Sequence, residues 1–80
     1  MEYTIGTIAL FPYNFVPYGW FLCNGQILPI SGNDTLYSLI GPFYGGDGSS
    51  TFALPNMQGL EPIYGLNYYI CCEGMYPTRD

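Results

Sequence analysis

The sequence predicts a small α+β domain over residues 1–80, with a small antiparallel or mixed sheet, one short helix and extensive ordered loops. Short segments rich in Tyr, Thr, Ile and Phe have the composition of strands. One segment combines helical spacing of apolar residues with start and stop signals. A segment with two prolines and a glycine-rich segment separate these elements, and both are expected to form irregular structure.

The first strand is expected at residues 2–10, with Gly6 marking a bulge or a close approach. In the following segment, residues 11–19, Pro12 and Pro17 exclude regular structure. This segment carries too many aromatic side chains for a solvated loop. We therefore expect an ordered, extended segment that packs against the domain.

Residues 19–28 are predicted to form a β-hairpin around Asn24-Gly25. A two-residue Asn-Gly turn needs positive φ at both positions, which Asn tolerates and Gly adopts freely. The first arm carries Trp20, the only tryptophan, and Cys23. Because an isolated hairpin with this much apolar surface is unstable in water, the remaining residues are expected to cover it.

A helix of about two turns is expected next, with Asn33 or Asp34 as its N-cap. Apolar residues at positions 36, 39 and 40 fall on one face of that helix. The Gly-Pro pair that follows should end it.

Residues 43–50 are predicted to form a tight glycine-rich loop. A phosphate-binding loop would need a lysine and a following helix, and a calcium loop would need several carboxylates where only Asp47 is present. A short strand at residues 51–55, a turn at 56–59, an irregular link at 60–65 and a strong strand at 66–72 complete the prediction.

The charge balance excludes several classes of partner. The chain has six acidic residues, one basic residue (Arg79), no lysine and no histidine, for a net charge of −5. Neither nucleic acid nor an anionic membrane surface would attract it. The longest apolar run is also too short to span a bilayer, and we expect no Sec-type signal peptide in this chain.

The three cysteines, Cys23, Cys71 and Cys72, lack the spacing of a zinc or redox motif. Cys71 and Cys72 should point to opposite faces of a strand, so we expect small buried hydrophobic residues rather than a disulfide between them. A bridge from Cys23 to either one is the alternative in an oxidising setting. Without histidine or lysine we expect no enzyme activity, no cofactor and no metal site.

The aromatic content points to contacts between molecules. Hydrophobic residues make up 49% of the chain and charged residues 9%, which favours self-association. The alternative is a carbohydrate- or receptor-binding module, because Tyr and Trp offer rigid contact area with a polar tip. The candidate contact residues for either function are Tyr13, Tyr18, Trp20, Tyr44, Tyr64, Tyr68 and Tyr76.

Several sequence blocks occur together in a characteristic order. The longest is NFVPYGWFLCNGQIL at residues 14–28. The others are residues 5–8 with Phe11, 36–41, 44–48, 51–59, 66–70 and 74–77. In these blocks the chain resembles the phage tail collar family, for which the block at residues 14–28 is the most diagnostic. That family includes bacterial proteins described as microcystin-dependent and the C-terminal collar of phage short tail fibres.

The resemblance implies a structural, extracellular module of a fibre or a phage-tail-like particle, forming a homotrimer. Low charge and exposed apolar surface would also fit a head-to-tail filament, with the first and last strands as edges for inter-chain pairing. Tail-fibre proteins or a surface glycan are the other expected partners. The family's long receptor-binding insertion with its histidine-bound metal is reduced here to residues 60–65. Tyr18, Leu60 and Tyr64 stand where the family often has basic residues or a histidine.

Overall fold

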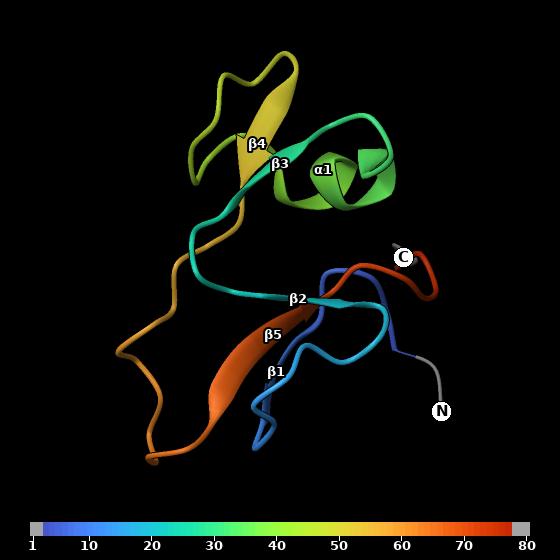
Figure 1. Ribbon diagram of the computed structural model, residues 1–80. Coiled ribbons are helices and arrows are strands. Elements are labelled where there is room, and N and C mark those ends of the chain that lie inside the picture. The colour runs from blue at the N-terminus through green and yellow to red at the C-terminus, as the bar shows by residue number, and fades with distance from the viewer. Residues whose placement is uncertain (1–2, 78–80) are drawn as a thin grey trace.

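A computed structural model describes residues 3–77, which form two antiparallel sheets and one helix (Figure 1). The α+β class predicted from the sequence is confirmed, with every strand pair antiparallel. The elements are β1 (Ile8–Phe11), β2 (Trp20–Leu22), β3 (Ile27–Pro29), α1 (Asp34–Ile40), β4 (Thr51–Ala53) and β5 (Asn67–Cys71).

The three-stranded sheet has the order β1-β5-β2, so the last strand in sequence lies in the middle. Ile70 of β5 stands opposite Ile8 and Phe21, while Tyr69 stands opposite Ala9 and Leu22. Successive side chains of a strand point to opposite faces. Each face of this sheet therefore packs into a core of its own.

The first core lies between the three-stranded sheet and the layer formed by α1 and the β3–β4 pair (Figure 1). In this core, side chains of α1, β3 and β4 pack in one cluster with Ile70 of β5. The buried members are Cys23, Leu28, Leu36, Phe52, Leu54 and Ile70. Phe52, Leu36 and Leu54 are almost completely removed from solvent, so the layer is held mainly by apolar burial.

The second core covers the opposite face and is built around Trp20, Tyr69 and Cys71. The Trp20 ring makes edge-to-face contacts with Tyr3 and Phe11, at centroid distances of 5.0 and 5.1 Å. Such T-shaped pairs are a favoured geometry for aromatic rings. The only tryptophan is thus a structural residue at the centre of an aromatic cluster.

The predicted Asn24-Gly25 hairpin is wrong, because β2 and β3 belong to different sheets. Gly25 has a φ of 77°, but no non-glycine residue among those described has a positive φ, so Asn24 cannot complete the two-residue turn. The Cys23 N–H donates instead to the Tyr68 carbonyl, and the Met57 N–H donates to the Cys23 carbonyl. This segment is a crossover between the two sheets.

The expected edge strands also need correction. The last strand is central, and the free edges of the three-stranded sheet belong to β1 and β2. The first strand is shorter than predicted, because a turn with Gly6 at a φ of 90° precedes β1. Thr4, before that turn, forms an isolated parallel bridge with Met75. Residue 2 of that prediction lies outside the described residues.

The helix agrees with its prediction at both ends. Asn33 occupies the N-cap, although its side-chain amide donates to the Pro29 carbonyl rather than capping the helix. Leu36 is the buried member of the apolar face. Gly41, at a φ of 69°, ends the helix, and its N–H donates to the Tyr37 carbonyl. No helix among the described residues is long and apolar enough to cross a membrane.

Within residues 3–77 the three cysteines are free. Cys71 lies in the second core and Cys72 packs against the first, as expected for neighbours on a strand. Burial raises the pKa of the Cys23 thiol to about 11, which keeps it protonated and unreactive at neutral pH. The prediction of small hydrophobic residues is confirmed for Cys23 and Cys71, which are fully buried.

Asp47 organises the glycine-rich loop through hydrogen bonds to the residues that follow it. Its Oδ1 accepts the N–H groups of Ser49, Ser50 and Thr51 at 2.7–2.8 Å, and its Oδ2 accepts the Ser50 hydroxyl at 2.7 Å. These bonds, first of all the one from the Ser50 N–H, hold the pKa of the Asp47 carboxyl below its usual value. The Asp47 carboxylate therefore fixes the conformation of this loop.

Replacing Gly46 by alanine should destabilise the fold much more than replacing Gly59. Both glycines have positive φ, at 81° and 89°, which costs an alanine about 1–2 kcal/mol. A Cβ on Gly46 would also lie 2.5 Å from the Phe52 Cα, whereas one on Gly59 would meet nothing within 4 Å. Gly46→Ala should lower the free energy of unfolding by about 1–3 kcal/mol more than Gly59→Ala, measured by urea denaturation. Equal losses would contradict this account of Gly46.

Acid should loosen the glycine-rich loop. Since the pKa of Asp47 is lower in the folded chain than in the unfolded chain, its contribution to stability is complete above about pH 4 and is lost as the pH falls further. We expect the Asp47→Asn variant to have a lower melting temperature than the unsubstituted protein at neutral pH. Its melting temperature should also fall less as the pH is lowered below about 4. Melting curves that fall in parallel for both proteins below about pH 4 would refute this.

Candidate ligand-binding groove and exposed apolar surface

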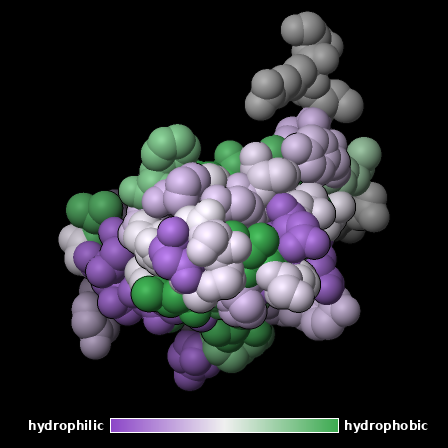
Figure 2. Space-filling view, turned by 90° about the horizontal axis from the view of Figure 1, so that it is seen from above, coloured by the Kyte–Doolittle hydropathy of each residue, from purple (hydrophilic) through white to green (hydrophobic). Residues whose placement is uncertain are grey.

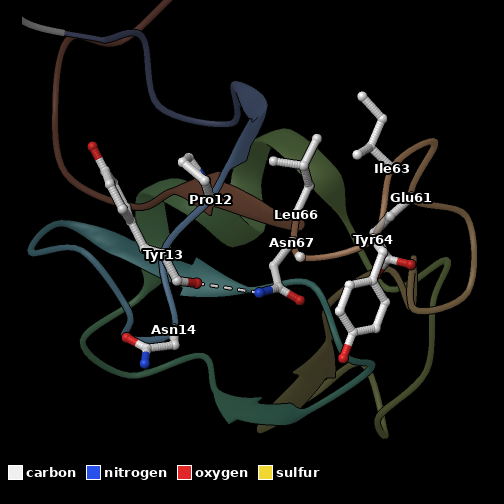
Figure 3. A pocket seen from close by; sticks show the side chains of 9 residues that line it. Pro12, Tyr13, Asn14, Glu61, Ile63, Tyr64, Leu66 and Asn67 are labelled. Carbon is white, nitrogen blue, oxygen red and sulfur yellow. Dashed lines mark hydrogen bonds between the residues drawn. The ribbon is translucent and has the colours of Figure 1, made fainter.

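An open groove of about 520 Å³ lies between two segments that are distant in sequence (Figure 3). One wall consists of residues 12–14, which follow β1, and the other of residue 61 and residues 63–67, which lead into β5. This volume falls within the usual range for small-molecule sites.

Side chains of β5 hold the first wall in place. The Tyr69 hydroxyl donates to the carbonyl oxygens of Tyr13 (2.8 Å) and Phe15 (3.2 Å), and the Asn67 amide donates to the Tyr13 carbonyl at 3.2 Å (Figure 3). Pro12 and Pro17 have no backbone N–H, so they cannot donate hydrogen bonds to a neighbouring β-strand. Hydrogen bonds from side chains therefore replace the ladder in this segment.

A stack of three aromatic rings stiffens the same wall. The Tyr13 ring lies 5.3 Å from that of Phe11 and 5.0 Å from that of Phe15, with interplanar angles of 10° and 14°. Phe11, Tyr13 and Phe15 are spaced by two residues. Residues with this spacing lie on the same side of an extended chain, so their rings can stack. These contacts order the segment, but the prediction that it packs down against the domain is wrong, because residues 12–16 and Tyr18 are exposed, with Phe15 at 61%.

The second wall is a link without regular structure. The Glu61 Oε1 accepts the Gly59 N–H at 2.8 Å, and the Leu66 N–H donates to the Ile63 carbonyl at 3.3 Å. Gly65 has a φ of 93°, and next to it the Tyr64 side chain is fully exposed. The link thus presents one aromatic ring and one carboxylate to the groove.

The groove is lined by aromatic, amide and carboxylate side chains. Tyr13 and Tyr64 supply aromatic rings, Asn14 and Asn67 supply amides, and Glu61 supplies a carboxylate. Within residues 3–77 no group of three His, Cys, Asp or Glu side chains could hold a metal ion. No arrangement of base and nucleophile is found in the groove.

The structure brings together only two of the residues predicted as contacts, Tyr13 and Tyr64, which both line the groove. The polar residues that complete the groove, Asn14, Glu61 and Asn67, were missed. Their sequence neighbourhood carries no motif, and only the fold joins the two segments.

The other predicted contact residues are scattered. Tyr18, Tyr44 and Tyr76 are 92%, 55% and 55% exposed, outside the groove. Trp20 is buried in the second core and Tyr68 packs against the first. Trp20 therefore offers little surface to a partner.

Many large apolar side chains stand on the surface, and Figure 2 shows several of them, in green, between hydrophilic neighbours. Lys and Arg are absent from residues 3–77. The most exposed apolar and aromatic side chains, each more than 60% accessible, are Phe15, Tyr18, Ile27, Phe43, Leu60, Ile63 and Tyr64.

These features define a small β-rich module with an aromatic, weakly charged surface. In a comparison with protein families, the model of the Phage Tail Collar Domain matches residues 6–62, and the chain belongs to this family. The family is a structural one, which gives the chain a structural role in phage tail fibres, as an extracellular virion component that associates with other phage proteins. A search of curated proteins and a search of solved structures found no match.

Removing the Tyr69 hydroxyl should loosen the first wall of the groove. Tyr69→Phe keeps the buried ring but removes the donor to Tyr13 and Phe15, so the free energy of unfolding should fall by about 0.5–1.5 kcal/mol. The backbone NMR order parameters of residues 13–16 should fall.

Tyr68→Phe is the matched control, because the Tyr68 hydroxyl has no hydrogen-bond partner among the described residues. It should leave both measurements nearly unchanged. A Tyr69→Phe variant with unchanged order parameters in residues 13–16 would show that the hydroxyl does not hold this segment.

Proposed function

We propose that this chain is a structural module of a phage-tail-like fibre or tip that self-associates, either into a closed trimer or into an open extracellular filament. The observation that carries the proposal is the exposed apolar surface, from which lysine and arginine are absent over residues 3–77. Single exposed apolar residues are ordinary, but so many on a small chain mark a contact surface.

Two edges of the three-stranded sheet support self-association. The outer sides of β1 and β2 have no neighbouring strand among the described residues, and neither strand carries a charged residue. Natural edge strands are usually protected by charges, prolines or bulges, because an exposed edge templates the addition of another strand. In this chain Pro12, which directly follows β1, is the residue of this kind nearest to the β1 edge.

The two assemblies use the same surface in different ways. A contact that closes on itself gives a ring of fixed size, such as the trimer that family resemblance implies, whereas a head-to-tail contact that does not close gives a filament. Both would bury apolar side chains now exposed to water, which is favourable by about 25 cal/mol per Å².

Sedimentation velocity and electron microscopy of the purified chain test this proposal. A trimer should show one mass over a range of concentrations, whereas a filament should lengthen as concentration rises. A stable monomer at micromolar concentration would refute both assemblies.

Ile8→Lys tests the β1 edge, since Ile8 is 40% exposed and lies outside both cores. Association should weaken by about tenfold or more, because an unpaired charge is costly to bury. Gln58→Lys adds the same charge to an exposed turn away from the sheet and should leave assembly unchanged. Circular dichroism would confirm that both variants fold. Normal assembly of Ile8→Lys would exclude the β1 edge as a contact.

A further inference from the structure

We propose that the groove between residues 12–14 and 61–67 binds a neutral hexopyranose unit. The proposal does not depend on self-association, since a single chain supplies both walls of the groove. It rests on an exposed aromatic ring, hydrogen-bonding groups without protein partners, and the sign of the charge in the groove.

Tyr64 supplies the stacking surface. Its side chain is fully exposed, so neither face of its ring is used by the described part of the chain. The C–H groups on one face of a pyranose ring are weakly positive and apolar, which suits the electron-rich face of an aromatic ring. An exposed tyrosine on the rim of a groove provides such a face.

Polar groups around Tyr64 suit sugar hydroxyls, which both donate and accept hydrogen bonds. Figure 3 shows the Asn67 side chain between Tyr13 and Tyr64, with Asn14 on the Tyr13 side. The Asn67 Nδ2 donates one of its two hydrogens to the Tyr13 carbonyl, which leaves its second hydrogen as a donor and its Oδ1 as an acceptor. Among the described residues, the Asn14 amide and the Tyr64 hydroxyl have no hydrogen-bond partner.

Charge selects a neutral sugar over an acidic one. Glu61 lines the groove, and no lysine, arginine or histidine occurs in residues 3–77. A uronic or sialic acid would place its carboxylate near the like charge of Glu61, without a cation to bind it. Phosphorylated ligands are disfavoured for the same reason.

The same polar groups argue against a second copy of the chain as the occupant. The self-association proposed above would bury the large apolar and aromatic side chains that stand exposed on this protein. Covering Asn14, Asn67 and Glu61 with such side chains would bury polar groups without partners, which is unfavourable. A sugar would pair these groups while its ring stacks on Tyr64.

Saturation-transfer NMR and titration calorimetry on the full chain test the proposal. The probes are the methyl glycosides of glucose, galactose, mannose and N-acetylglucosamine, with methyl galacturonide as the acidic counterpart. At least one neutral probe should bind, more tightly than the acid. A blank with all neutral probes, or tighter binding of the acid, would overturn the proposal.

Matched variants locate the site. Tyr64→Ala should weaken binding of the neutral probe by about tenfold, whereas Tyr64→Phe should keep most of it, since the ring remains. Tyr18→Ala is the control, because Tyr18 is 92% exposed but lies outside the groove. Equal weakening by Tyr64→Ala and Tyr18→Ala would overturn the proposal, as would a Tyr64→Ala variant that changes assembly but not sugar binding.

Glu61→Gln tests the role of charge. The glutamine Oε1 can still accept the Gly59 N–H, so the link should keep its shape. Binding of the neutral probe should change less than about threefold, and the acidic probe should gain affinity as the like charge is removed. Unchanged discrimination against the acid would show that Glu61 does not set the preference.

Discussion

The central place of β5 in the three-stranded sheet is the constraint on which the rest of the structure depends. β5 pairs with β1 on one side and β2 on the other, and its alternating side chains serve both cores. Ile70 enters the first core, while Tyr69 and Cys71 enter the second. A shift of one residue in register would exchange these faces. Because Tyr69 also holds residues 13–15, the same register positions one wall of the groove.

Local signals in the sequence were sufficient for the elements whose geometry is local. The helix, its glycine stop and the Asp47 loop follow from spacing and short-range hydrogen bonds. The choice of strand partners did not follow, because it is set by distant residues. The Asn24-Gly25 signal assumes that the flanking strands pair with each other, yet β2 pairs with β5 and β3 with β4. Local turn preference was overridden by burial of Trp20 and Leu28 in separate cores.

The groove was predictable only in part, for a related reason. Exposed tyrosines were recognised as contact residues from composition, and Tyr13 and Tyr64 do line the groove. Asn14, Glu61 and Asn67 are common loop residues that become a set only when β1 and β5 lie side by side. Trp20 is the opposite case, since its rigid ring with a polar tip suggested a contact and its strand pairing places it in a core. The sequence shows the chemical groups that the groove residues carry, but it does not show which of these residues lie close together in the fold.

The bridge between Thr4 and Met75 places the start of the β1 region beside the end of the β5 region. Thr4 precedes β1 and Met75 follows β5, so a force that pulls these two residues apart would act at one end of the antiparallel β1–β5 pair. Such a pair unzips one hydrogen bond after another, instead of resisting in shear along its whole length. We therefore expect the module to offer little resistance to a force in this direction. In a fibre under tension, the load would therefore have to pass through contacts between neighbouring modules and not through the backbone of a single one.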